Sequence, residues 1–144
     1  MPRPPGGPPL GLLLDRVARE VSRAFDARLT AAGGSRSVWL VLLALRRGPV
    51  ASQRELADAL GLRAATLTQQ LDAMESAGLV ARTADPANRR VHGVELTEAG
   101  VALFDRLRNA ARAHDEQLRA GLDDSDVARV VAALEQMRRN VGGA

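Results

Sequence analysis

The stretch from Ser52 to Leu96 limits what this chain can fold into more than any other part of the sequence. It begins with Ser52-Gln53-Arg54-Glu55, a capping-box pattern in which the Ser and Glu side chains accept from each other's backbone amides. A short helical pattern follows and ends at Gly61, and a second helix is predicted from Arg63 to about Ala77. The side chains expected to point inward are Leu56, Ala59 and Leu60 in the first helix and Leu67, Leu71 and Met74 in the second.

Two short segments follow, Val80–Arg82 and Val91–Leu96, and predict a pair of strands. In the second, a period of two places His92, Val94 and Leu96 on one face. Between them, Asp85-Pro86-Ala87-Asn88 places Asp and Pro at the first two positions of a type I turn. We therefore expect a hairpin with a long tip that carries arginines. Two short helices joined by a tight turn and followed by such a hairpin indicate a winged helix-turn-helix, whose second helix fits the major groove of DNA.

Longer helical patterns lie on both sides of this stretch. An apolar stripe predicts a helix from Leu10 to about Ala32, and a mostly apolar central helix runs to Arg47 after a cap at Ser35 or Ser37. After the hairpin, the predicted helices are one capped by Thr97 that reaches about Leu118 and one that starts at Asp123, Asp124 and Asp126. In both, apolar residues recur at steps of three and four, which favours packing against a partner helix. The predicted fold class is mainly α with a small two-stranded β-wing.

The composition excludes several kinds of chemistry. All 20 basic residues are Arg, so neither a Walker-type phosphate loop nor Schiff-base catalysis is available. Without Cys there is no thiol catalysis or disulfide, and with only His92 and His114 we expect no metal site and no cofactor. No local pair of carboxylates suggests a hydrolase, so we expect no enzyme. The longest apolar run, Val38–Leu45, is shorter than the about 20 residues of a membrane span, which predicts a soluble cytoplasmic protein.

Position matters more than total charge for the candidate DNA contacts. The net charge is only +3, and residues 48–90 hold five Arg and five acidic residues. Polar side chains at the start of the second helix have lengths that suit bases and phosphates, and an Arg on a thin hairpin can enter the minor groove. The predicted DNA-binding residues are Ser52, Gln53, Arg54, Arg63, Ala64, Thr66, Thr68, Gln69, Gln70, Arg82, Arg89 and Arg90. Asp85 is expected to orient one wing guanidinium. The alternative for both sets is an ordinary solvated surface.

At these residues the sequence resembles the MarR family of bacterial transcription regulators, over about Leu10 to Val141. The motifs that resemble the family's wing and helix-turn-helix are Asp85 to Arg90 followed by Leu96-Thr97-Glu98-Ala99-Gly100, Glu55-Leu56-Ala57, Gly61-Leu62, Thr66-Leu67-Thr68, Glu75-x-x-Gly78-Leu79-Val80 and Trp39-x-Val41-Leu42. The resemblance implies a homodimer held by its first and last helices, with two DNA-binding lobes on a pseudo-palindromic operator. It also implies frequent release by a small, often phenolic, ligand.

Four positions depart from the family's pattern. Ala87 stands where the wing usually has Arg, so contact with the minor groove falls to Arg89 or Arg90. The remaining departures are Arg63 at the usual Ser cap, Gln69 at a common Arg position and Gln70 at a usual apolar position. Because a Gln side chain can pair with adenine, Gln69 suggests a different preferred base. These changes put the operator sequence in question, but not the class of partner.

The patterns and the resemblance together predict four regions. They are an expected disordered tail over residues 1–9, a dimerisation helix and the central helix over 10–47, the DNA-binding lobe over 48–96, and dimerisation helices over 97–144. The expected function is a sequence-specific transcriptional repressor that acts as a homodimer on double-stranded DNA, with a small-molecule ligand as a further partner. The zero net charge of residues 48–90 motivates an alternative, a winged-helix scaffold that binds a protein and not DNA.

For the remaining candidate side chains, the sequence allows both a functional and a structural interpretation. Arg16, Arg23 and Trp39 are candidates for effector binding. For Arg16 and Arg23 the alternative is a solvated helix face, and for Trp39 it is the core. His114 lies on a helical stripe expected at the dimer interface, where it is either a structural histidine or a sensor of metal or pH.

Overall fold

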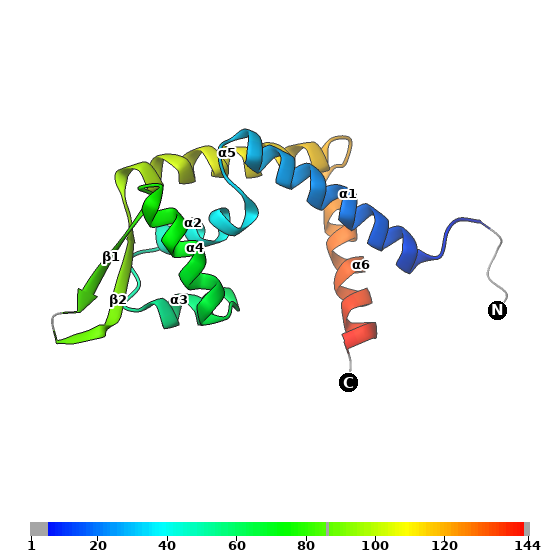
Figure 1. Cartoon of the computed structure of the whole chain (residues 1–144). Helices are drawn as coiled ribbons and strands as arrows, with labels where there is room; N and C mark the ends of the chain where they lie inside the picture. The colour runs from blue at the N-terminus through cyan, green and yellow to red at the C-terminus, as the bar shows by residue number, and fades with distance from the viewer. Residues whose placement is uncertain (1–5, 86, 143–144) are drawn as a thin grey trace. The chain divides into compact units, whose positions relative to one another are not determined.

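The computed structural model describes residues 6–85 and 87–142, and Figure 1 shows a helix-and-hairpin region with long helices before and after it in the chain. The elements in chain order are α1 (Leu10–Ala31), α2 (Arg36–Arg46), α3 (Gln53–Leu60), α4 (Ala64–Ser76), β1 (Val80–Asp85), β2 (Asn88–Leu96), α5 (Glu98–Arg119) and α6 (Asp124–Gly142). The predicted class, mainly α with a two-stranded wing, is confirmed. The chain divides into two compact units, Met1–Ala111 and Arg112–Ala144. Residues 1–5 of the predicted tail lie outside the described residues.

The first unit has one apolar core, to which the helices and the hairpin all contribute. The buried residues of this core are Leu29, Val41, Leu42, Leu45, Leu56, Ala57, Leu67, Leu71, Met74, Val80, Val94, Leu103, Phe104 and Leu107. The α1 stripe reaches this core only at its end, because Leu29 is buried whereas Leu10 is 47% exposed. The first half of α1 therefore leaves an apolar surface uncovered within this chain.

Helices α2 and α3 begin at serines whose hydroxyls accept from backbone amides. The Ser35 hydroxyl accepts from the Val38 amide at 3.2 Å, which identifies Ser35 as the cap of α2. The Ser52 hydroxyl accepts from the Glu55 amide at 3.1 Å, the first of the two bonds predicted for the capping box. In α3 the inward prediction for Ala59 is wrong. Ala57 is buried instead, since the stripe centred on Leu56 turns Ala59 away from the core.

The hairpin is longer and its connection shorter than predicted. Antiparallel pairing runs from Val80 opposite Leu96 to Asp85 opposite Asn88, so the expected long tip is wrong. The register shifts between Ala84 and Asp85, and the β2 segment there is longer than the β1 segment opposite it. Pairing of the backbone amides extends both strands beyond the residues whose apolar alternation marked them.

A third segment of backbone pairs with the base of the hairpin. Val50, in the connection between α2 and α3, exchanges two backbone hydrogen bonds with Val94 of β2, both at 3.1 Å. A single bridging residue has no alternating pattern, so the sequence contained no signal for this contact. The bridge attaches the start of α3 to the hairpin.

Thr97 and Gly100 join the start of α5 to the connection between α4 and β1. The Thr97 amide donates to the Leu79 carbonyl at 3.1 Å, and the Thr97 hydroxyl donates to the Gly78 carbonyl at 2.5 Å. The same hydroxyl accepts from the Gly100 amide at 3.1 Å, which caps α5 as predicted. A Cβ at Gly100 would overlap the Leu79 carbonyl oxygen, so only glycine permits this approach.

In the second unit, reciprocal bonds mark the start of α6. The Asp126 amide donates to the Asp123 carboxylate at 2.8 Å, and the Asp123 amide donates to the Asp126 carboxylate at 3.1 Å. That amide and the Arg129 guanidinium hold the pKa of Asp126 below its usual value. None of the described α6 residues is buried, and Leu134 is 43% exposed. In the described part of the chain, no helix combines the length and apolar character that crossing a membrane requires.

The close approach at Gly100 predicts a large effect of adding one methyl group. We expect Gly100→Ala to lower the free energy of unfolding by about 1–3 kcal/mol, because the neighbouring atom is rigid backbone. Gly11→Ala is the matched control, since Gly11 also lies in a helix but has no heavy atom within 4 Å of its Cβ position. Urea unfolding followed by circular dichroism measures both, and equal stabilities would contradict the packing argument.

Candidate nucleic-acid interface

Helix α4 presents one apolar and one polar side. Leu67, Leu71 and Met74 are buried in the core, as predicted. The described residues of α4 that remain exposed include Ala64, Thr66, Thr68 and Gln69, and Gln70 is half-buried. Since the core holds one face of the helix, the polar residues at its start face solvent.

The start of α4 is exposed and has no acidic residue in its first turn. Arg63 is the N-cap residue, and its side chain makes no capping hydrogen bond. The amides at a helix start carry partial positive charge, so this end attracts anions such as phosphate. The exposed Arg63 guanidinium adds a full positive charge at the same place.

The start of α3 contributes the next three predicted residues. Ser52 is partly buried, and its hydroxyl serves as the cap of α3. Arg54 is exposed on the first turn. Gln53 is half-buried, and its side-chain amide nitrogen donates to the Thr68 hydroxyl of α4 at 3.5 Å. The structure thus brings Gln53 and Thr68 together, although they are far apart in the sequence.

Arg82 lies between the wing and α4, and its guanidinium is already bound to protein groups. It donates from Nη2 to Asp72 at 2.6 Å and to Glu75 at 3.0 Å, and from Nη1 to Gln53 at 3.4 Å. These bonds to Glu75 and then Asp72 raise the pKa of Arg82 above its usual value. Asp72 and Glu75 were not among the predicted site residues. Their spacing of three residues, which puts both on one side of a helix, was the available signal.

The remaining predicted wing residues are Asp85, Arg89 and Arg90. The backbone of Asp85 lies in β1 and that of Arg89 and Arg90 in β2. Their side chains lie outside the described part of the structure. The role of Asp85 in orienting a guanidinium and the contacts of both arginines therefore stay predictions.

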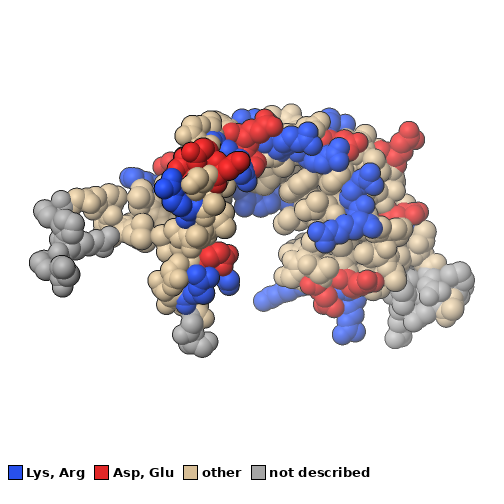
Figure 2. All heavy atoms as spheres, turned by 180° about the vertical axis from the view of Figure 1, so that it is seen from behind, with Lys and Arg blue, Asp and Glu red and all other residues tan. Residues whose placement is uncertain are grey.

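Charge is intermixed on the surface. Figure 2 shows basic and acidic side chains alternating over the visible face, with no continuous basic patch there. This agrees with the equal numbers of Arg and acidic residues in 48–90. On this face, attraction to an anionic partner therefore depends on individual arginines and not on a basic patch.

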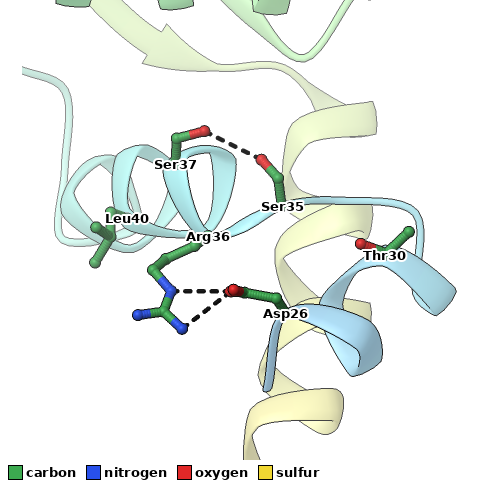
Figure 3. A pocket seen from close by; sticks show the side chains of 6 residues that line it. All are labelled: Asp26, Thr30, Ser35, Arg36, Ser37 and Leu40. Atoms are coloured by element: carbon green, nitrogen blue, oxygen red, sulfur yellow. Dashed lines mark hydrogen bonds and ion pairs between the residues drawn. The ribbon is translucent and has the colours of Figure 1, made fainter. Parts of the chain in front are cut away.

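A hollow of about 590 Å³ lies between α1 and α2, lined by Asp26, Thr30, Ser35, Arg36, Ser37 and Leu40 (Figure 3). Its wall includes an ion pair in which Arg36 donates to Asp26 at 3.0 Å. Arg36 also donates to the Ser22 carbonyl at 3.2 Å and lies 5.6 Å from the centre of the Phe25 ring. These contacts make Arg36 a link between the two helices.

The three effector candidates have separate surroundings. Arg16 and Arg23 are exposed on α1, where Arg23 lines a second hollow along that helix. Trp39 stacks on the Phe104 ring with centroids 5.4 Å apart and an angle of 12° between the planes. This contact makes Trp39 part of the packing between α2 and α5, and its role in effector binding stays a prediction.

Histidine and carboxylate groups are the side chains of this chain that could serve as metal ligands, since it has no Cys. His114 of α5 is buried, with 8% exposed, and the side chain of His92 is outside the described residues. Among the side chains that the structure describes, no three His, Asp or Glu residues are grouped so that they could hold a metal ion.

Known proteins share both this sequence pattern and this geometry. A sequence model of the MarR family matches residues 35–92. The structure is similar to that of the transcriptional repressor CouR bound to a 23-mer DNA duplex, with a TM-score of 0.76 and 30% identity, covering 91% of this chain and 93% of that one.

Two further structures agree with this match. One is a mutant of MarR from E. coli complexed with operator DNA, with a TM-score of 0.73, 25% identity and coverage of 90% of this chain and 93% of that one. The other is a transcriptional regulator of the MarR family from Rhodococcus sp. RHA1, with a TM-score of 0.70, 27% identity and coverage of 89% and 92%.

The uncapped start of α4 predicts that a hydroxyl at position 63 will stabilise the protein. Arg63 has the extended backbone of an N-cap, so a Ser there can accept from an amide of the first turn. We expect Arg63→Ser to raise the free energy of unfolding by about 1 kcal/mol, measured by urea denaturation. Arg63→Ala, which removes the same charge without supplying an acceptor, is the control and should bring no such gain. Identical values for the two variants would show that capping does not limit α4.

Proposed function

Because the chain belongs to the MarR family of transcriptional regulators, we propose that it is a homodimeric repressor that reads a pseudo-palindromic DNA operator. The observation that carries this proposal is the exposed polar start of α4 beside a hairpin that holds Arg89 and Arg90. A helix of this kind fits the major groove, and an arginine on a hairpin fits the minor groove.

The residues of α4 divide into those that position the helix and those that can read bases. Its apolar side is anchored in the core, so the helix can enter a groove without losing its own packing. Gln69 and Thr66 are exposed away from that side and can reach base edges, with Gln69 suited to adenine. Arg63 and Arg54 are exposed at the helix starts and are suited to phosphates. The DNA in the similar CouR and MarR structures supports this assignment.

A homodimer accounts for the apolar surfaces that remain exposed on the first and last helices. On α1 these are Leu10, Leu12, Leu14 and Val17, and on α6 they are Val130, Val131, Leu134 and Val141. Contiguous exposed apolar residues at helical spacing favour burial against a second copy. A dimer on a pseudo-palindrome places its two recognition helices about one helical turn apart, roughly 34–36 Å.

Release by a small molecule is the regulatory part of the proposal. The hollow beside Arg36 offers hydroxyl groups, the apolar Leu40 and the ion pair of Arg36 with Asp26, a combination that suits a small ligand with polar groups. Arg16, Arg23 and Trp39 remain the residues that we predicted from the sequence for this role.

Duplex binding tests the function. Fragments bound from genomic DNA are selected, a footprint defines the operator, and affinity is measured at several salt concentrations. We expect affinity to fall as salt rises, in proportion to the phosphates contacted. Arg89→Ala and Arg90→Ala should weaken binding to many sequences and reduce the salt slope by about 1 for the residue that contacts DNA.

Two outcomes would contradict parts of this proposal. If both wing variants keep the slope of the parent protein, the hairpin does not contact DNA. If the parent protein shows no salt-dependent binding to any duplex, a winged-helix scaffold for a protein partner becomes the better assignment.

The dimer is tested by a charge on the exposed stripe of α6. Leu134 is 43% exposed, and we expect Leu134→Glu to convert the dimer to a monomer, because a buried carboxylate would lack a partner. Light scattering measures the mass of each protein. Gln136→Glu adds the same charge on the same helix outside the predicted apolar stripe and should remain a dimer. A dimeric Leu134→Glu protein would place the interface elsewhere.

A further inference from the structure

Arg82 is the point at which three elements of the DNA-binding lobe are joined by polar contacts. The residue lies on β1, and its guanidinium donates to Asp72 and Glu75 of α4 and to Gln53 of α3, at 2.6, 3.0 and 3.4 Å. Its backbone amide donates to the second oxygen of Glu75 at 3.2 Å. Gln53 in turn donates to Thr68. One side chain therefore links the wing, the recognition helix and the start of α3.

The same contacts leave little of Arg82 available to a phosphate. The side chain is 18% exposed, and the side chains of Asp72 and Glu75 are 58% and 43% exposed. Both terminal nitrogens of the guanidinium already donate to protein oxygens. These bonds use three of the five N–H groups of the guanidinium, and the low exposure of the side chain restricts access of a phosphate to the remaining two. Loss of Arg82 would in turn leave two carboxylates exposed beside the interface without their partner.

We propose that Arg82 is a positioning residue for DNA recognition, which holds the hairpin at a set distance from α4 and shields two carboxylates of α4, and does not itself contact DNA. This inference rests on the proposed function, since it concerns how the same interface selects its operator. It replaces the sequence-based prediction that Arg82 contacts DNA together with Arg89 and Arg90.

A direct contact and a positioning role predict opposite effects when the carboxylates are removed. Asp72→Asn combined with Glu75→Gln keeps the size of both side chains and removes two negative charges. If Arg82 were a phosphate contact, this change would release it and tighten binding to every duplex. If Arg82 positions the wing, the affinity of the double variant for the operator falls relative to its affinity for a shuffled duplex, although the protein has become more positive.

The experiment measures affinity for the selected operator and for a shuffled duplex of equal length, each at several salt concentrations. We expect Arg82→Gln to reduce the ratio of the two affinities by roughly tenfold, about the cost of one mismatched base pair, with the salt slope unchanged. Arg82→Lys should recover part of the ratio, because an ammonium group retains the charge but cannot span Gln53, Asp72 and Glu75. Arg19→Gln is the control, since it removes an arginine from an exposed ion pair with Asp15 on α1.

Three results would overturn the inference. The first is a salt slope that falls by about 0.9 in Arg82→Gln with the affinity ratio intact, which marks a phosphate contact. The second is tighter binding of both duplexes by the Asp72 and Glu75 double variant with the ratio of the two affinities unchanged. The third is a ratio of operator affinity to shuffled-duplex affinity that equals that of the parent protein in every variant.

Thermal melting separates recognition from folding. If Arg82→Gln does not fold, the double variant and Arg82→Lys, compared at a temperature where both are folded, provide the test. Failure of the parent protein to prefer any duplex contradicts the proposed function. A parent protein that prefers its operator beside variants with unchanged ratios contradicts only the role of Arg82.

Discussion

Burial of one apolar stripe of α4 is the interaction on which the rest of the DNA-binding lobe depends. Leu67, Leu71 and Met74 are almost wholly buried, and each such side chain contributes about 1.5–3 kcal/mol relative to an exposed one. When one side of a helix is buried in the core, the opposite side faces solvent. The same burial that anchors α4 therefore turns Thr66 and Gln69 toward solvent. The stability of the lobe and the entry into a groove that we propose thus depend on opposite sides of a single helix.

Placed charges, and not total charge, decide what this lobe can bind. Its segment is neutral overall, and an arginine such as Arg82 that is bound to two carboxylates has a different effect from an exposed one such as Arg63. The carboxylates of Asp72 and Glu75 would repel phosphate if they stood alone. Their pairing with Arg82 allows acidic residues to remain on the recognition helix and to serve as attachment points for the wing.

The sequence predicted the elements whose signals are local. Periodicity placed the buried side of α4, and the Ser52 and Thr97 caps followed from side-chain chemistry close to each helix start. Predictions failed where the local signal was weak or absent. The prediction that Ala59 is buried is wrong because a helix of two turns defines its apolar side poorly. The predicted strands are too short because backbone pairing extends beyond the apolar pattern. The Val50 bridge to Val94 joins residues 44 positions apart, and neither residue indicates the other.

By itself, the sequence determined the class of fold, the order of its elements and the kind of partner, because helical period, capping and turn chemistry depend on neighbouring residues. Only the tertiary structure decided which groups distant in the sequence a polar side chain contacts. Arg82 is the clearest example, since it looks like any other basic residue on a wing until folding brings Asp72, Glu75 and Gln53 within hydrogen-bonding distance. The role of a charged side chain depends on the groups that surround it in space, and those come from elements that the sequence keeps apart.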